Sequence, residues 1–253
     1  MAKIDLSLIL ACYNEGPTFA QSVLRIVEAL KKLKVNWEII FVEDKSSDDT
    51  LDEIKSLARK VKNSKLLIHN KNHGRGKSVS DGIRAAKGEI CGYLDVDLEI
   101  SENYIPIFVD EIKKGYDMVV GKRYFEAGYK SLARFLASKI YSFLVKASIR
   151  IPISDTEAGY KFFKRDRILP VLFKVRDNHW FWDTEICAKA YWMGLTISEI
   201  PVLFVRRRDK KSTVRLIPDT IDYIKNLIRL KSQITNSKFQ TNLKSKIINS
   251  KQF

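Results

Sequence analysis

A chain of 253 residues with 45% hydrophobic content can bury a sizeable core and is most simply one large domain with a possible appendage. Its three cysteines, Cys12, Cys91 and Cys187, lie far apart without CxxC spacing, which argues against a disulfide framework or zinc site and favours a reducing compartment. The net charge of +15 is uneven, because thirteen Lys or Arg stand against three Asp from Arg206 onward, and it predicts an anionic partner.

Four short segments within the first hundred residues have the composition of strands. Residues 4–12 form a nearly unbroken apolar run, which is typical of a strand buried on both faces of a parallel sheet. The other three predicted strands are residues 37–42, residues 65–69 and the segment that begins at Ile90. Helical patterns separate them, over residues 18–33, 51–58 and 79–86. This alternation predicts a doubly wound α/β fold, with a mostly parallel sheet flanked by helices.

The second half of the chain continues the alternation less regularly. Further helices are predicted at residues 101–114, 131–148 and 180–193. Further strands are predicted at residues 118–120, within residues 155–164 and at residues 197–204. Residues 124–130 show little periodicity and predict a mobile loop. We therefore expect a single domain over residues 1–215.

Residues 216–253 differ in character and form a predicted basic helical tail. One face of a helix over residues 217–231 is traced by five apolar side chains, those of Ile217, Ile221, Ile224, Leu227 and Ile228. Such a basic amphipathic helix either packs on the domain or lies at a membrane surface, and the pattern leaves both alternatives open. From Ser232 onward polar residues dominate, so we expect loose order.

Hydropathy bounds how the chain can meet a membrane. No window holds the roughly 18 to 20 uncharged apolar residues that a spanning helix requires. The first apolar run is short and is interrupted by Asp5, unlike a secretory signal. We expect a cytoplasmic protein that lies peripherally on the inner face of a membrane.

Three carboxylates end the apolar segment that begins at Ile90. Asp95, Asp97 and Glu99 stand two positions apart, and alternate side chains of an extended backbone share a face. We therefore expect the three acids to converge. Oxygen ligands of this kind suit Mg²⁺ or Mn²⁺, particularly one that also binds substrate phosphates, whereas the alternative is a solvated strand end.

Polar residues also follow the first two predicted strands, at residues 13–15 and at Glu43 and Asp44. Ligands of doubly wound sheets bind beyond the carboxyl ends of the strands. Because all three polar groups follow strands, we expect Asp44, Asp95 and Asp97 to line one crevice.

Other polar residues have two interpretations each. Lys77 lies either near a bound phosphate or at a solvated helix start, and the P-loop motif is absent because Lys71 stands where it requires glycine. Asp183 and Glu185 are the late acids that could act as a base, although acids also cap helix starts. Asp155 could close a turn. The aromatic side chains around them lie either in the core, which their tendency to be buried favours, or against lipid, namely Trp180, Phe181, Trp182 and Trp192.

Nine motifs stand in a fixed order along residues 4–215. They are AcYNEG, VEDkSSDDT, NhGrGKs, DVDLE, VVGKRY, Arg134 with Ser138, SDTeaGYKFFKR, FWDTEI and EIPVLFvRR. Together they resemble the family-two glycosyltransferases of the GT-A type, a Rossmann-like fold. The branch they resemble most makes polyprenyl-phosphate sugars, as dolichol-phosphate mannose synthase and dolichyl-phosphate glucosyltransferase do. The match makes residues 1–215 the expected catalytic domain.

The resemblance implies a role for each matching residue. The implied nucleotide contacts are Ala11, Tyr13, Glu15, Asp44, Lys77, Asp95 and Val96. Asp97, with Glu99 as a second ligand, would hold a Mg²⁺ or Mn²⁺ ion that bridges the diphosphate. Receipt of the acceptor phosphate is implied for Arg123, Arg134, Ser138 and Arg207. Relatives commonly carry a glycine after the last arginine, and its absence from residues 207–212 puts the role of Arg207 in doubt.

The expected activity is therefore an inverting, metal-dependent transfer of a hexose, mannose or glucose, from a GDP- or UDP-sugar to a polyprenyl phosphate. A prenyl phosphate is already anionic, so it needs cationic positioning more than a general base. One alternative is a saccharide acceptor, which would require a base such as Asp183. The other is a basic nucleic-acid-binding protein, but the charge is concentrated in the tail, so we expect no nucleic-acid partner.

Overall fold

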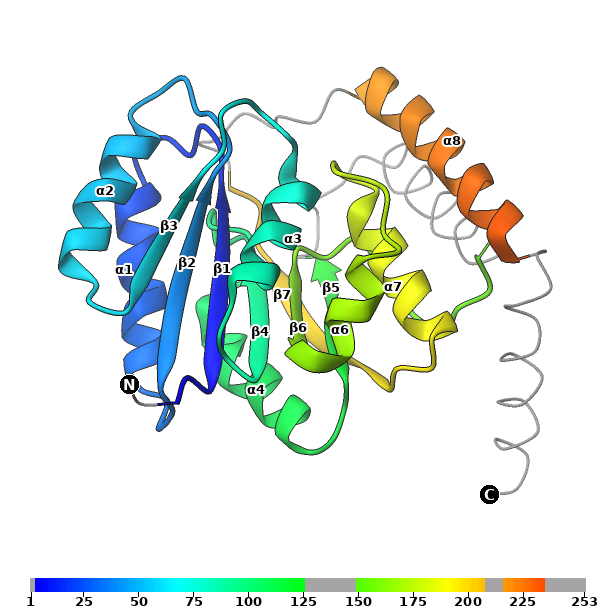
Figure 1. The fold of residues 1–253 in the computed structure, drawn as a ribbon, viewed down its shortest axis with the longest axis horizontal. Coiled ribbons are helices and arrows are strands. Elements are labelled where there is room, and N and C mark those ends of the chain that lie inside the picture. Colours follow the sequence, from blue (N-terminus) through cyan, green and yellow to red (C-terminus); the bar gives the residue numbers. More distant parts are fainter. Residues whose placement is uncertain (1–2, 126–148, 208–215, 235–253) are drawn as a thin grey trace.

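The computed structural model describes residues 3–125, 149–207 and 216–234 (Figure 1). Its strands are β1 (Leu6–Cys12), β2 (Trp37–Glu43), β3 (Ser64–Ile68), β4 (Ile90–Leu94), β5 (Met118–Phe125), β6 (Tyr160–Lys164) and β7 (Ile197–Phe204). Its helices are α1 (Phe19–Lys31), α2 (Thr50–Lys60), α3 (Arg75–Ala85), the 3₁₀ helix η1 (Glu102–Tyr104), α4 (Ile105–Lys113), α6 (Arg165–Leu172), α7 (Trp182–Trp192) and α8 (Leu216–Ile234).

The strands form one seven-stranded sheet in the order β3-β2-β1-β4-β6-β5-β7. β3, β2, β1 and β4 run parallel, β6 runs antiparallel to both of its neighbours, and β5 runs parallel to β7. The carboxyl ends of six strands and the amino end of β6 therefore lie along one edge of the sheet, which we call the upper edge. The prediction of a mostly parallel α/β sheet is confirmed.

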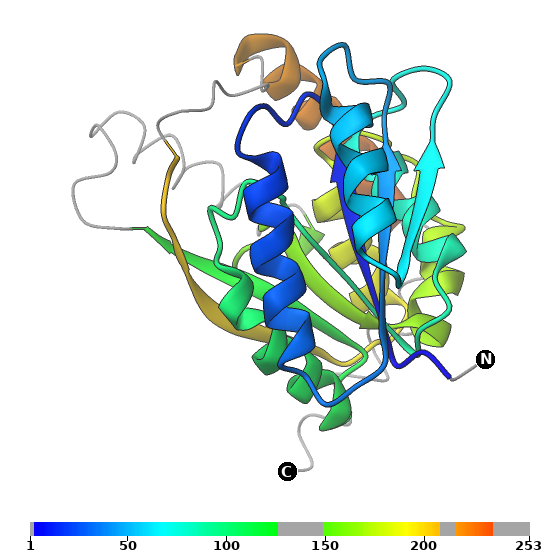
Figure 2. The same ribbon diagram turned by 90° about the vertical axis from the view of Figure 1, so that its left-hand side faces the viewer.

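Helices cover both faces of the sheet, each over its own apolar cluster. Leu8 and Leu10 of β1 face a cluster that includes α1, α2 and α4, and Figure 2 shows α1 lying across that face. Ile9 faces the opposite cluster, which includes α3, α6, α7 and α8. Since alternate residues of β1 are buried on opposite faces, the strand requires the apolar run that the sequence supplies.

Two predicted boundaries were wrong. α3 begins at Arg75 and not at residue 79, because Gly74, with φ of 96°, starts the helix and the Lys77 N–H donates to the Asn178 carbonyl at 3.0 Å. β5 continues to Phe125, because each of its eight residues pairs with β7, and Arg123 therefore lies within the strand. The helix α6 was not predicted, since it contains Pro170 and follows β6 directly.

The predicted loop and helix between residues 126 and 148 lie outside the described residues, as does the chain beyond residue 234. Residues 232–234, expected to be loose, continue α8. All three cysteines are buried, and burial raises the pKa of Cys91 and of Cys187 to about 12, as expected for small apolar side chains.

The helix α8 packs on the domain with a face that, among the described side chains, shares only Leu227 with the apolar stripe of the sequence pattern. Tyr223, Leu227 and Leu230 are buried in the cluster beneath α7, and the Tyr223 hydroxyl lies 2.6 Å from Thr184 Oγ1. Ile221, Ile224 and Ile228 point to solvent with exposed fractions of 48%, 49% and 65%. The helix thus has two apolar stripes, one buried and one exposed.

Gly92, in the middle of β4, provides a test of the packing. A Cβ atom at Gly92 would lie 2.5 Å from the Phe162 ring, whereas one at Gly121 meets no atom closer than 3.3 Å. We expect Gly92→Ala to lower the free energy of unfolding by about 1 to 3 kcal/mol in a denaturant titration, because the central strands must move apart. Gly121→Ala is the matched control and should cost less. Equal losses would contradict the packing described here.

Candidate active site

The acids that follow β4 lie on a turn and not on a strand. The Leu98 N–H donates to the Asp95 carbonyl at 3.2 Å, and Leu98 has a positive φ of 55°. The expectation of three acids on one face of an extended backbone was therefore wrong in its geometry. The turn still keeps them close, since burial together with the negative charge of Asp97 raises the pKa of Glu99.

Arg75, which sequence reasoning missed, binds Asp95. Its Nε and Nη2 atoms donate to Asp95 Oδ1 at 2.9 and 2.6 Å, and its Nη1 atom donates to Asp183 of α7. The two carboxylates outweigh burial and raise the pKa of Arg75 well above its usual value. Gly159 makes room for the group, because a Cβ atom there would lie 1.8 Å from Asp95 Oδ2. One guanidinium therefore joins the turn after β4 to α7.

Asp183 is buried and surrounded by donors. Lys161 Nζ donates to its Oδ1 atom at 2.5 Å, and the Tyr93 hydroxyl donates to the same oxygen. Burial opposes ionisation of Asp183, but the charges of Arg75 and Lys161 outweigh it and lower the pKa of this carboxyl below its usual value. A carboxylate with a lowered pKa and several donors is a poor general base.

Glu185, the other candidate base, has both carboxylate oxygens bound by groups of the protein. Its Oε2 atom accepts the N–H groups of Arg176 and Asp177 at 3.0 and 2.8 Å, and its Oε1 atom lies 2.6 Å from Lys189 Nζ. Glu185 is completely buried beneath α8. It therefore holds residues 176–177 in place and does not face a substrate.

Asp44 organises the loop that leads into α3. Its carboxylate accepts the N–H groups of His73 and Gly74 at 2.9 and 2.8 Å, and its Oδ1 atom lies 2.6 Å from His69 Nδ1. Because Gly74 precedes Arg75, Asp44 and Asp95 are linked through two consecutive residues. The structure thus brings Asp44, Asp95 and Asp97 to the upper edge, and a crevice shared by all three stays a prediction.

The residues after β1 join the same edge. The Asn14 side chain accepts the Ser47 N–H at 2.8 Å, the Asn14 N–H donates to Ser46 at 3.1 Å, and the Glu15 N–H donates to Thr50 Oγ1 at 2.9 Å. Tyr13, which precedes them, is exposed. These bonds hold the loop after β1 against the loop after β2.

The three remaining predicted nucleotide contacts are placed differently. Ala11 is partly buried in β1 beside Val42, and the Val96 side chain is buried under the turn. Lys77 Nζ is held by Asp81 one helical turn further along α3. Arg75 and not Lys77 is therefore the α3 cation that binds an acid of the turn. The signal that could have found it was the helix start at Gly74.

Arg123 lies on β5, further along the sheet. Its Nε and Nη2 atoms donate to Asp155 at 2.7 and 2.9 Å, and Glu157 lies 3.6 Å away. Burial opposes ionisation of Asp155, but the charge and hydrogen bonds of Arg123 outweigh it and lower the pKa of that carboxyl. Of the other residues predicted to receive a phosphate, Arg134 and Ser138 lie outside the described residues.

Arg207 lies at the turn that carries Asp97. Its N–H donates to Glu99 Oε1 at 3.0 Å, and its guanidinium donates to the Asp97 carbonyl at 3.3 Å and to Thr18 Oγ1 at 2.6 Å. Arg206 lies 3.5 Å from Glu99 as well. The segment after β7 therefore lies against the turn that carries Asp97 and Glu99.

The chemistry of the turn fits a hard divalent cation. Asp97 and Glu99 are neighbouring like charges, and the pKa of Glu99 stays raised although Arg206 and the Arg207 N–H face it, so a cation would stabilise the pair. Asp95 is bound by Arg75, and the described residues contain no group of three His, Cys, Asp or Glu side chains arranged to hold a metal. The protein can thus supply two carboxylates, and a substrate diphosphate would supply further oxygens, as is usual for Mg²⁺.

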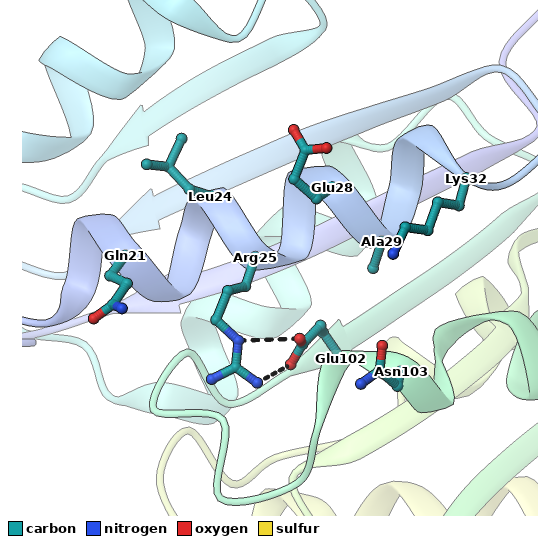
Figure 3. A pocket seen from close by; sticks show the side chains of 8 residues that line it. All are labelled: Gln21, Leu24, Arg25, Glu28, Ala29, Lys32, Glu102 and Asn103. Atoms are coloured by element: carbon teal, nitrogen blue, oxygen red, sulfur yellow. Dashed lines mark hydrogen bonds and ion pairs between the residues drawn. The ribbon is translucent and has the colours of Figure 1, made fainter.

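A groove of about 270 Å³ lies between α1 and η1, away from these acids (Figure 3). Arg25 reaches across it and donates to both carboxylate oxygens of Glu102 at 3.0 and 2.8 Å. None of the acids that follow β1, β2 and β4 lines it. The Arg25–Glu102 pair ties α1 to the segment that follows the Asp97 turn. The groove is therefore a structural contact between these elements and is separate from the candidate active site.

The buried charges predict a pH dependence. The pKa of Asp183 is lowered from 3.8 in the folded state, so its contribution to stability is present above pH 3.8 and is lost as the pH falls through the folded-state pKa. We expect Asp183→Asn to lose about 3 to 5 kcal/mol near pH 7, because Arg75 and Lys161 lose their partner. The difference from wild type should shrink below pH 3.8.

Denaturant titrations between pH 7 and pH 2 measure this effect. The exposed Asp110 of α4 provides the control, since Asp110→Asn should change stability by less than about 0.5 kcal/mol. A difference between Asp183→Asn and wild type that stays constant down to pH 2 would contradict the assignment.

Comparison with known proteins agrees with this geometry. Residues 7–169 match the family model described as glycosyl transferase family 2. Glycosyltransferase AglD of Haloferax volcanii is 28% identical over 97% of this chain and 39% of its own length. Dolichyl-phosphate beta-glucosyltransferase ALG5A of Trichomonas vaginalis is 28% identical over 79% of this chain and 66% of its own length. The chain thus spans two thirds or less of these relatives.

A solved structure gives the same fold. Glucosyl-3-phosphoglycerate synthase from Mycobacterium tuberculosis, in complex with Mn²⁺, UDP and phosphoglyceric acid, superposes with a TM-score of 0.69. The match covers 90% of this chain and 78% of that one at 16% identity. The sheet order, the acids at its upper edge and a family match over more than half of the sequence lead to one conclusion: the chain belongs to glycosyl transferase family 2.

Proposed function

We propose that this protein is an inverting, metal-dependent glycosyltransferase that moves a hexose from a nucleotide sugar to a polyprenyl phosphate. The family supports sugar transfer, and the name of the Trichomonas vaginalis relative, a dolichyl-phosphate glucosyltransferase, supports a lipid phosphate acceptor. We propose residues 1–215 as the catalytic unit and residues 216–253 as a basic segment that meets a membrane on its cytoplasmic, inner face.

The observation that carries the choice of acceptor is the state of Asp183. A saccharide hydroxyl must lose its proton during attack, so its enzyme needs a base near the acceptor. Asp183 has a lowered pKa and is bound by Arg75, Lys161 and Tyr93, and Arg123 lowers the pKa of Asp155 in the same way. A phosphate acceptor needs no base, because its oxygen is already anionic.

The reaction then follows from charge. An oxygen of the prenyl phosphate attacks the anomeric carbon, the bond from that carbon to the diphosphate breaks, and the electron pair leaves with the nucleoside diphosphate. Attack from the opposite face inverts the anomeric centre. A divalent cation held by Asp97 and Glu99 would stabilise the charge on the diphosphate. Arg123 would receive the acceptor phosphate by exchanging it for Asp155, and Arg134, Ser138 and Arg207 would complete that site.

The proposed binding site for the nucleotide-sugar donor lies at the upper edge of the sheet. Tyr13, Glu15 and Asp44 would hold the base and ribose, with Asp95 nearby. We propose UDP-glucose as the first candidate, because the superposed synthase binds UDP and the second relative is named as a glucosyltransferase. GDP-mannose is the second candidate. Mn²⁺ or Mg²⁺ is the proposed ion, since solved synthase structures hold one or the other with UDP.

The second part of the proposal is that α8 contacts an anionic membrane surface. Among the described residues no helix is both long and apolar enough to cross a bilayer. Ile221, Ile224 and Ile228 are exposed on α8, and the sequence from Arg206 onward carries thirteen cationic residues against three acids. An anionic lipid surface fits both, because its head groups attract the cations and its acyl boundary takes up the isoleucines.

The activity is tested by incubating the protein with Mn²⁺, a short-chain prenyl phosphate and either UDP-glucose or GDP-mannose, then assaying lipid-linked hexose. We expect product from one donor, and Asp97→Ala should lower the rate at least about a hundredfold with an unchanged melting temperature. Asp110→Asn provides the control. Transfer to a saccharide and not to the lipid would replace the acceptor proposal, and absence of both products and of nucleotide binding would end it.

Membrane contact is tested by sedimentation with vesicles that contain anionic phospholipid. We expect the double variant Ile224→Glu, Ile228→Glu to bind about tenfold or more weakly, because burying each isoleucine is worth about 1.5 to 3 kcal/mol. Leu24→Glu, at an exposed site on α1, provides the control and should bind as wild type does. Equal binding by all three proteins would show that α8 does not meet the lipid.

A further inference from the structure

We propose that the indole of Trp180 forms one wall of the subsite for the hexose of the donor. The inference rests on the proposed function, because it requires a nucleotide-sugar donor at the upper edge. It adds a contact that the motifs do not assign, since the sequence pattern placed Trp180 in the core with its aromatic neighbours.

Trp180 departs from that pattern. Phe181, Trp182 and Trp192 are buried, whereas 40% of the Trp180 side chain is exposed. Trp37, the remaining tryptophan of the chain, begins β2 and therefore lies at the opposite edge of the sheet. A large aromatic side chain left in solvent loses the free energy of burial, so its exposure beside a candidate site points to a ligand.

The segment that carries Trp180 is fixed from both sides. Glu185 accepts the N–H groups of Arg176 and Asp177, and Asp177 accepts the His179 N–H at 2.8 Å. On the other side, the Asn178 carbonyl accepts the Lys77 N–H at 3.0 Å. The position of the indole is thus set by the backbone of α3 and by the buried carboxylate of α7.

The indole lies beside Arg75, the residue that binds Asp95. The Arg75 Cζ atom is 6.0 Å from the centre of the Trp180 ring, and the same guanidinium donates to Asp95 at 2.6 Å. Arg75 therefore has Trp180 beside it and Asp95 at its edge. Trp180 and Asp95 are therefore both neighbours of one guanidinium, and 48% of the Asp95 side chain is exposed.

The surroundings select a hexose over an isoprenoid chain. Arg75 is bound by Asp95 and Asp183, so a group that fits here must donate to the exposed part of the Asp95 carboxylate and must also cover an apolar ring. A hexose has hydroxyl groups along its rim for the first requirement and a face of C–H bonds for the second. An isoprenoid chain has no polar atoms, so it would leave Asp95 and Arg75 desolvated without new partners.

The test compares a nucleotide sugar with its own nucleoside diphosphate in the presence of Mn²⁺ and without acceptor. Dissociation constants are measured by calorimetry for UDP-glucose against UDP, and for GDP-mannose against GDP. For the pair that binds, we expect Trp180→Ala to weaken the nucleotide sugar about five- to tenfold and to leave the diphosphate unchanged. Trp180→Phe should be intermediate because it keeps a smaller ring.

Tryptophan fluorescence provides a second measurement that a structural role would not change. The nucleotide sugar, but not the diphosphate, should shift the emission of wild type, and Trp180→Phe should remove that shift. Trp37→Phe is the matched control and should keep it. Circular dichroism and melting temperature verify that each variant is folded.

The outcomes separate the possibilities. Equal weakening of nucleotide sugar and diphosphate by Trp180→Ala would overturn the inference and place the indole beside the nucleotide. Unchanged donor affinity with a raised KM for the prenyl phosphate would overturn it in favour of the acceptor. If wild type binds none of the four nucleotides, the proposed function fails and this inference fails with it.

Discussion

The structure depends on one cation placed between two carboxylates. Arg75 joins Asp95, on the turn after β4, to Asp183 at the start of α7, and Lys161 adds a second positive charge to Asp183. Buried charges are tolerated only when they are paired and hydrogen-bonded, so this group ties the turn after β4 to α7. Arg75 binds one oxygen of Asp95, and 48% of the Asp95 side chain remains exposed.

The same group changes what the late acids can do. From the sequence, Asp183 was open to two interpretations, a base or a helix cap, because a carboxylate at a helix start fits either one. The structure adds the two cations and Tyr93, which make it a fixed counter-ion. The motif therefore did not define the chemistry of Asp183. Its neighbours Tyr93 of β4, Lys161 of β6 and Arg75 of α3 define it.

Local patterns of the sequence predicted most of the fold. The apolar run of β1 and the alternation of strands and helices required a parallel sheet, and that sheet brought Asp44, Asp95 and Asp97 to one edge. Arg75 and the length of β5 could not be predicted, because each depends on a partner distant in sequence, Asp183 in one case and β7 in the other. The exposure of Trp180 was missed for the same reason, since aromatic residues favour the core only on average.

The antiparallel strand β6 has a consequence for the order of folding. β1 to β4 are contiguous in sequence, and among the described strands they pair with one another and with β6, so their parallel sheet has mostly short crossovers. β6 closes the sheet from about seventy residues further along the chain, which makes its pairing with β4 a slow, non-local step. During synthesis from the amino terminus, the first half can form with Arg75 still hydrated, and the site is complete only when α7 docks and supplies Asp183.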